Sequence, residues 1–315
     1  ASASVSVTIV LSSKVSGKIT FDLVPLDSST SGLDYASTRI APARGILVEL
    51  LDSENNLIAS TTTDAAGDYS LPSGLNSELR VRVSSRMVRG DIWDVKVTDN
   101  TNGGALYAGQ GELFNPSVDD LVRDLHFDSG WSVDGYGEAR SAGPFAILDA
   151  VYEAKQTFFS VDPALRFPAL EIFWSEKNSS ADGSIEEGDI GTSFYQEGNI
   201  YILGKSDEDT DEYDRHVIIH EWGHYFEDKI ARSDSIGGPH GVGEKLDFRV
   251  AFSEGWGNAI SAIVTNDQFY RDSSGKNQAL GFSIDVENND VRNPGWFSEG
   301  SVQSILFDLY DEQDD

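Results

Sequence analysis

Cysteine is absent from this chain of 315 residues, and methionine occurs once. Without cysteine the protein has no disulfide, no thiol nucleophile and no thiolate ligand for a metal ion. Any metal site must therefore use histidine, aspartate or glutamate. Histidine is itself scarce, with five copies in the chain, so a pair of histidines at ligand spacing is a rare pattern here.

Positive charge is the second scarcity. The chain has 23 lysines and arginines against 53 aspartates and glutamates, which gives a net charge of −30. So acidic a surface repels phosphate groups and therefore argues against nucleic acid and anionic lipid as partners. It suits high salt or a secreted protein. We expect a protein that is secreted or held at a bacterial cell surface or in the periplasm.

Long apolar runs are also missing. No run approaches the roughly 18–20 residues that a membrane-spanning helix needs, so we expect no membrane span. The first ten residues, "ASASVSVTIV", lack the charged start and apolar centre of a secretory signal and favour a β-strand.

Seven β-branched, partly alternating runs fill the first 128 residues, and clusters of Gly, Asn, Asp and Ser separate them. The runs are "SVSVTIVL", "GKITFDLVPL", "GILVELLD", "NLIASTTT", "ELRVRVSS", "DIWDVKVTD" and "DLVRDLHF". No helical period interrupts them. This pattern predicts an antiparallel β-sandwich over residues 1–128.

One turn within this region is specific. In "TTTDAAGDYSLPSG" (61–74), Asp64 can bond its own backbone, Gly67 can supply a positive φ, and Tyr69 restarts the alternation pointing inward. With "PARGILVELLD" upstream, the stretch resembles the carboxypeptidase regulatory-like, transthyretin-like sandwich domain over about 50 residues. Such domains accompany enzymes or surface proteins, and the resemblance implies no chemistry of their own.

The pattern changes after a Gly- and Ser-rich linker at 129–143. Helical spacing appears in "PFAILDAVYEAKQTFF", "RHVIIHEWGHYFEDKIA" and "LDFRVAFSEGWGNAISAIV", and "ALEIFWS" and "NIYILG" favour short strands. We therefore expect an α+β domain over 144–315. The acidic run "SDEDTDEYD" (206–214) is interpreted as a solvated loop whose charges suit the following helix dipole. The end, "FDLYDEQDD", reads as a helix without a stop, which suggests truncation at the C-terminus.

Two histidines stand four positions apart in "HEWGH". On a helix the imidazoles of His220 and His224 lie on one face, where both can bind one cation. Glu221 leans to the same side and can hold a water at that cation. This is the H-E-x-x-H arrangement of zinc peptidases, and the resemblance implies that Glu221 is the general base.

A catalytic zinc ion needs a third protein ligand and an open position. Thirty residues after His224, Glu254 lies in "AFSEGWGNAIS", where neighbouring glycines allow two helices to approach closely. Asp247 and His240 are alternatives for this ligand. Asn258, one turn after Glu254, is placed to hydrogen-bond a ligand from behind.

The combination of "HEWGH" with "SEGWG" resembles the gluzincin group of zinc metallopeptidases. The resemblance implies a zincin-like fold, one catalytic Zn²⁺ held by His220, His224 and Glu254, and a peptide or protein substrate. It also implies that "NIYILG" is an edge strand that aligns the substrate, and that a His or Tyr steadies the oxyanion. The candidates for that role are His240, Tyr201 and Tyr310.

Two other functions remain open. One is a surface binding or adhesion protein with an inactive zincin fold, which the intact Glu221 argues against. The other is a zinc hydrolase that acts on non-peptide substrates. A calcium site is a weaker expectation, because "DGSIEEGD" (182–189) is rich in oxygen ligands but lacks the ordered spacing of a calcium loop.

Overall fold

The computed structural model describes residues 13–73, 78–116, 120–241 and 243–311, so the expected strand "SVSVTIVL" lies outside the described residues. The helices are α1 (Gly143–Val161), α2 (Arg215–Lys229), α3 (Phe248–Thr265) and α4 (Glu299–Asp308), with short 3-10 turns η1 (Tyr35–Ser37), η2 (Asn100–Asn102), η3 (Asp211–Tyr213) and η4 (Lys276–Gln278). The strands are β1 (Ser13–Leu23), β2 (Arg39–Pro42), β3 (Ile46–Asp52), β4 (Leu57–Thr62), β5 (Asp68–Ser73), β6 (Leu79–Arg89), β7 (Trp93–Asp99), β8 (Ala105–Leu106), β9 (Ala108–Gln110), β10 (Leu121–Val122), β11 (Leu125–Phe127), β12 (Leu170–Trp174), β13 (Phe194–Gln196), β14 (Asn199–Ile202), β15 (Gly204–Lys205), β16 (Asp209–Thr210), β17 (Phe269–Ser274) and β18 (Leu280–Asp285).

The N-terminal region is β-rich, as the alternating runs predict. One sheet has β1 at its centre, and a second sheet contributes β3, β4, β6 and β9. Val15 and Ile19 of β1 and Val48 and Val83 of the second sheet are fully buried in a common core. Two sheets around one core are consistent with a sandwich. However, β1 pairs antiparallel with β2 and β5 but parallel with β10 and β11, so the expectation of purely antiparallel pairing is wrong. After β5 the chain forms β6 to β9 in the second sheet. It then returns to the first sheet, where β10 and β11 run parallel to β1.

The turn between β4 and β5 forms as expected. The Asp64 carboxylate accepts hydrogen bonds from the backbone N–H groups of Ala66 (2.8 Å) and Asp68 (2.9 Å). Gly67 has φ +79°, and Tyr69 is buried. A side chain at Gly67 would also meet the carbonyl oxygen of Ile19 at 2.5 Å, so both conformation and space require glycine there.

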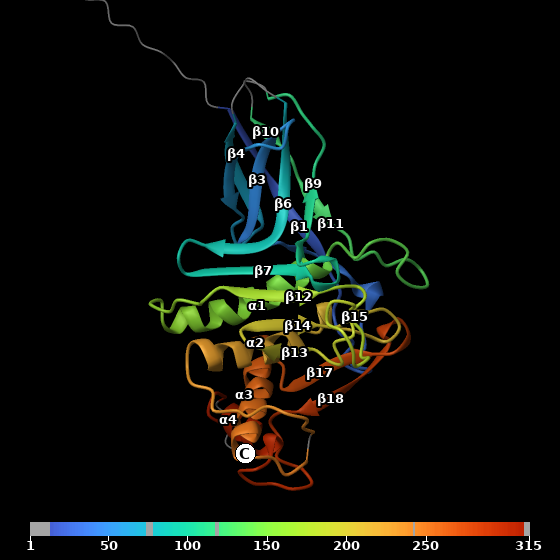
Figure 1. Ribbon diagram of the computed structural model, residues 1–315, viewed down its shortest axis with the longest axis vertical. Coiled ribbons are helices and arrows are strands. Elements are labelled where there is room, and N and C mark those ends of the chain that lie inside the picture. The colour runs from blue at the N-terminus through green and yellow to red at the C-terminus, as the bar shows by residue number, and fades with distance from the viewer. Residues whose placement is uncertain (1–12, 74–77, 117–119, 242, 312–315) are drawn as a thin grey trace, which may run out of the picture.

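One continuous sheet joins the two halves of the chain. Its order is β13-β14-β12-β7-β6-β3-β4, with β8 and β9 beside it. The last residues of β6 pair with β7, and β7 pairs in parallel with β12 (Leu170 opposite Val95). Figure 1 shows β7, α1, β12 and β14 as layers between the N-terminal strands and the C-terminal helices. The division into 1–128, 129–143 and 144–315 stays a prediction, and the sheet crosses it.

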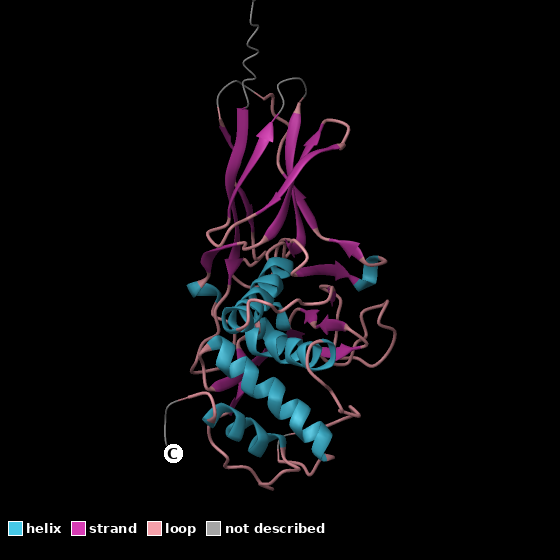
Figure 2. Cartoon of the chain, turned by 90° about the vertical axis from the view of Figure 1, so that its left-hand side faces the viewer, coloured by secondary structure: helices cyan, strands magenta, loops and turns pink. Residues whose placement is uncertain are grey.

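The C-terminal half packs helices against this sheet, and Figure 2 shows them gathered away from the N-terminal strands. Helix α2 crosses α3 closely at Gly223. A Cβ added there would lie only 2.9 Å from Cγ2 of Ile260 and 3.4 Å from the Cα of Gly257. Asp247 caps α3 by accepting a hydrogen bond from the Arg249 N–H at 3.0 Å, and α3 ends at Asn266 in the left-handed conformation. No helix in the described part of the chain is long and apolar enough to cross a membrane.

Three local expectations are wrong. The strand in "NIYILG", β14, lies between β12 and β13, so the edge is β13. Helix α4 ends at Asp308, within the tail that reads as an unstopped helix. The acidic run at 206–214 is largely buried, since Asp211, Glu212 and Asp214 are 2%, 0% and 0% exposed. Asp214 makes no side-chain cap on α2.

Candidate metal centre

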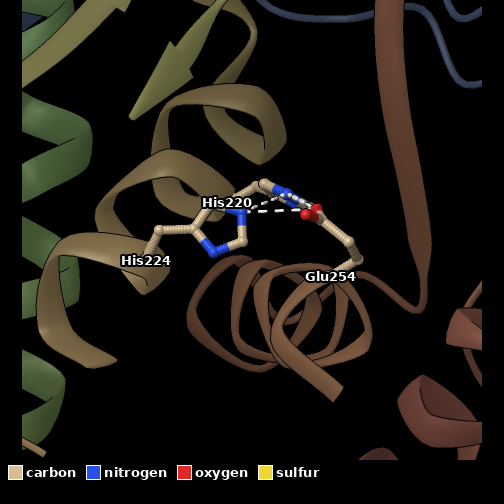
Figure 3. A group of neighbouring side chains, drawn as sticks. All are labelled: His220, His224 and Glu254. Carbon is tan, nitrogen blue, oxygen red and sulfur yellow. Dashed lines mark hydrogen bonds and ion pairs between the residues drawn. The ribbon is translucent and has the colours of Figure 1, made fainter. Parts of the chain in front are cut away.

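Three side chains from two crossing helices converge on one point. His220 and His224 come from α2, and Glu254 comes from α3 (Figure 3). The two Nε2 atoms lie 3.0 Å apart, and they lie 3.1 Å and 3.3 Å from Oε2 of Glu254. Histidines four apart on a helix share a face, and the glycines at the crossing bring the glutamate within reach.

Hydrogen bonds behind the histidines set their orientation. Nδ1 of His220 lies 2.9 Å from Oδ1 of Asn258, whose amide donates to Oε1 of Gln303 at 2.9 Å. The amide therefore presents its oxygen to the ring, so Nδ1 carries a proton and Nε2 is the ring nitrogen that faces the site.

The second imidazole is held in the same way. Nδ1 of His224 lies 3.1 Å from Oγ of Ser253, and Ser253 donates its own proton to Glu227 at 2.6 Å. The serine oxygen therefore accepts a hydrogen bond from Nδ1–H of His224, whose Nε2 is left to face Glu254.

The charges at this point are strongly coupled. Burial alone would lower the pKa of His220, but the hydrogen bond to Glu254 and the nearby carboxylates outweigh it and raise the pKa to about 9. Burial would raise the pKa of Glu254, yet the two histidines hold it well below its usual range. The glutamate is thus kept as an anion that faces two ring nitrogens, which is the charge pattern of a cation site.

Glu221 lies beside this point without joining it. Its side chain is buried, and burial raises its pKa, while the charges of His220 and His224 oppose the shift. It lines a cavity of about 1180 Å³ together with the three converging residues and the edge strand β13. A buried carboxylate with a raised pKa is a stronger base than an exposed one.

The other residues predicted from the sequence fall in different places. His240 lines the cavity, with Nε2 at 3.2 Å from Oε2 of Glu254. Asp247 is exposed at the start of α3, where it pairs with Arg249, so it is not a ligand. Tyr201 stacks between Phe173 and Phe194, outside the cavity lining. Tyr310 follows α4, is 55% exposed and also lies outside the cavity lining. Neither tyrosine is therefore placed to steady the oxyanion, the role that the sequence suggested.

Tyr270 was missed by sequence reasoning. It lies on β17, its ring is 5.9 Å from that of His220, and it lines the cavity. Its strand follows α3 and has no motif spacing to the histidines, so nothing in the sequence signals it. Ser253, Glu227 and Gln303 were missed for the same reason, although Ser253 is adjacent to Glu254.

The comparisons with known proteins agree with a peptidase relationship for the C-terminal part. The family model described as the Mycolysin C-terminal domain matches residues 169–315, which include both helices of the site. This match points toward a metallopeptidase family. No curated protein matches the chain. A Pseudomonas aeruginosa structure reported as a candidate carbohydrate binding protein is similar at 12% identity, covering 36% of this chain and 88% of its own, with a TM-score of 0.21.

Proposed function

We propose that this protein is a zinc-dependent peptidase of gluzincin type, with a zincin-like fold in its C-terminal half and a regulatory-like sandwich before it. One observation supports this most. Three potential ligand atoms converge within 3.0–3.3 Å of one another, and Glu221 lies beside them in a large open cavity.

The residues fit a zinc ion. Donor atoms at about 2.0–2.1 Å from a tetrahedral zinc ion are about 3.3 Å apart, close to the separations found here. Two neutral imidazoles and one carboxylate are a usual catalytic ligand set, and each imidazole has its second nitrogen engaged. When bound, zinc supplies a Lewis acid that polarises a carbonyl and acidifies water.

The chain's own residues perform the proton transfers. Glu221 takes a proton from the attacking water and passes it to the leaving amine. Its burial favours this role, because a carboxylate with a raised pKa holds a proton more readily between the two steps. Asn258 and Ser253 keep the imidazoles turned toward the site throughout.

The edge strand β13 is the proposed substrate platform. β14 covers one side of β13, and within the described residues no strand pairs with the other side. Phe194, Tyr195 and Gln196 all line the cavity that contains Glu221. An extended peptide can add to such an edge by backbone pairing, which would align its carbonyl groups along the site.

His240 is the proposed oxyanion donor. It lies on the loop between α2 and α3, it is 35% exposed, and its Nε2 points at the ligand cluster. Tyr270, which lines the same cavity, is a second donor candidate. A hydrogen bond from either group would stabilise negative charge on the substrate oxygen.

The test measures zinc content and peptide cleavage together. Purified protein supplied with zinc is expected to hold about one zinc per chain and to cleave members of a broad peptide library. Glu254→Ala should lose zinc, whereas Asp247→Ala, at the exposed acidic residue that caps the same helix, should retain it. Absence of bound zinc in the parent, or equal zinc loss in both variants, would contradict the site assignment.

A further inference from the structure

A second group of acidic side chains lies apart from the histidine site. Asp209 on β16, Asp211 on η3 and Asp272 on β17 each bring a carboxylate oxygen to within 4.8 Å of the others. The segments are far apart in sequence, so folding itself collects these charges. No such group of three forms at 182–189 within the described residues, and calcium there stays a prediction.

The group is buried at Asp211 and partly buried at Asp209 and Asp272, and it lacks compensating positive charge among the described residues. Asp211 is 2% exposed, and neighbouring Asp214 is fully buried. Across residues 13–73, 78–116, 120–241 and 243–311, none of these aspartates forms an ion pair with a lysine, arginine or histidine. Buried charges without a partner cost several kcal/mol each by order of magnitude. These carboxylates are therefore charged together only when a counter-charge is bound, and are otherwise partly protonated.

Unpartnered oxygen atoms indicate that a ligand belongs there. One carboxylate oxygen of Asp209, of Asp211 and of Asp214 is shielded from water and receives no hydrogen bond from the described residues. The remaining oxygens of two of them are held in place, since Asp211 accepts from Ser193 and Asp214 accepts from the N–H and Oγ of Ser273. Buried acceptors in native proteins are normally satisfied.

We propose that Asp209, Asp211 and Asp272 form a binding site for a calcium ion. The ligands are all oxygen, which a hard cation prefers, and oxygens bound to calcium at 2.3–2.6 Å can be up to about 5 Å apart. Asp214 lies behind the site and adds negative charge. The side chain of a basic peptide is a poorer occupant, because Asp211 is almost fully enclosed while a small ion fits among carboxylates.

The electrostatics support the same conclusion. Burial first, and then the charges of neighbouring carboxylates, hold the pKa of Asp211 well above its ordinary value. Burial and the charge of Asp209 raise the pKa of Asp272 to about 7. These carboxylates therefore resist ionising together, and a divalent cation would relieve their repulsion.

The site would fasten the start of α2 to β17. Asp214 immediately precedes α2, the helix of His220, and it is hydrogen-bonded to Ser273 on β17, the strand that carries Tyr270. Its three ligands line the same cavity as the histidine site, which provides a route for the ion. The proposal does not depend on hydrolytic activity, because it concerns different side chains.

The test is calcium binding by the full chain with the histidine site saturated by zinc. Calcium titrated into zinc-loaded protein, from which every metal except zinc has been removed, should bind at about one per chain and raise the melting temperature. Magnesium at the same concentration should raise the melting temperature much less. Asp211→Asn should abolish the calcium-dependent rise, and its melting temperature without calcium should exceed that of the parent, because one repelling charge is gone.

The control is Asp128→Asn, which changes an acidic residue of the more exposed Asp22, His126 and Asp128 group and should leave calcium binding intact. If Asp211→Asn does not fold, Asp272→Asn at the less buried ligand decides the question. The proposal would be overturned if calcium gave the parent neither a heat of binding nor a rise in melting temperature. It would also be overturned if the ligand variants still bound calcium. An equal shift with magnesium would overturn the assignment to calcium.

Discussion

Lys155 lies in the core, where its ammonium group faces aromatic rings. Lys155 on α1 is fully buried, its Nζ has no hydrogen-bond acceptor among the described residues, and it lies 4.4 Å from the centre of the Phe167 ring. Burial lowers its pKa to about 7. The aromatic faces of Phe167 and Tyr225 offset part of the cost of the charge, but they do not restore the ordinary pKa.

This lysine predicts a pH-dependent stability. Between about pH 7 and the ordinary pKa of lysine, the unfolded chain binds a proton that the folded chain does not, so the stability of the parent rises with pH. Lys155→Met removes this proton. The variant should be more stable than the parent at pH 7, and its advantage should shrink by about 1.4 kcal/mol per pH unit toward pH 9.

Denaturant unfolding at pH 7, 8 and 9 measures the difference in free energy of unfolding between Lys155→Met and the parent. Lys14→Met, which changes an exposed lysine, is the control and should leave the difference independent of pH. If the free energy of unfolding of Lys155→Met differs from that of the parent by the same amount at all three pH values, Lys155 stays charged in the core.

Glu221 and Glu254 are neighbouring carboxylates for which we propose different roles. Glu254 faces both ring nitrogens, whereas Glu221 is buried beside them. Glu221→Gln should keep zinc and the melting temperature of the parent but lose hydrolysis by at least about 100-fold, because an amide cannot accept the proton of water. Activity assays with zinc analysis check this. Exposed Glu187→Gln is the control, and a Glu221→Gln variant that still cleaves would remove Glu221 from the mechanism.

Helix crossing is the element-scale feature on which the site depends. A Cβ at Gly257 would lie 2.7 Å from Nδ1 and Cε1 of His220. Gly257→Ala should therefore push the imidazole out of place and weaken zinc binding by about 10–100-fold, as is typical for residues that orient a ligand. Competition with a metal chelator measures this affinity.

Gly255 provides the matched control on the same helix. A Cβ there would meet Cβ of Val302 on α4 at 2.6 Å, so Gly255→Ala should lower the melting temperature while leaving zinc affinity near that of the parent. Alanine is the better helix former by about 1 kcal/mol, so propensity cannot explain a loss in either variant. Equal zinc affinity in Gly257→Ala and the parent would refute the close-contact argument.

Elements that carry a regular apolar period in a short stretch of sequence were predictable. The apolar period of α1 and α3 and the alternation of β1, β3, β5 and β6 are visible in short windows, and so is the His220–His224 pair. The burial of 206–214 was not predictable, because an isolated acidic run matches a solvated loop. What buries Asp214 is β17, and its partner Ser273 lies 59 residues further along the chain. The misplaced edge strand has a similar cause, since β13 lies in a polar segment without a strand pattern.

At the scale of the whole molecule, the shared sheet predicts that the two halves fold together. A fragment of residues 129–315 would expose β12 along the edge that β7 covers, and α1 would lose the buried surface of Trp93, Val95 and Val97. We expect this fragment to remain unfolded or to aggregate. Circular dichroism and thermal melting of the fragment beside the full chain check this. A cooperative transition in the fragment would show that 144–315 is an independent domain.

The pairing of β7 with β12 also limits how such a protein can change over generations. A recombination event at the predicted linker 129–143 would exchange the N-terminal strands as one unit. It would also separate β7 from β12, although the two strands share backbone hydrogen bonds and a core. A newly acquired N-terminal module would have to supply a strand in the direction and register of β7 before the helices of the site could pack. The pairing therefore predicts that the N-terminal half is inherited with the site, and that sequence drift in β7 is constrained by the partner strand 75 positions further along the chain (Leu170 opposite Val95).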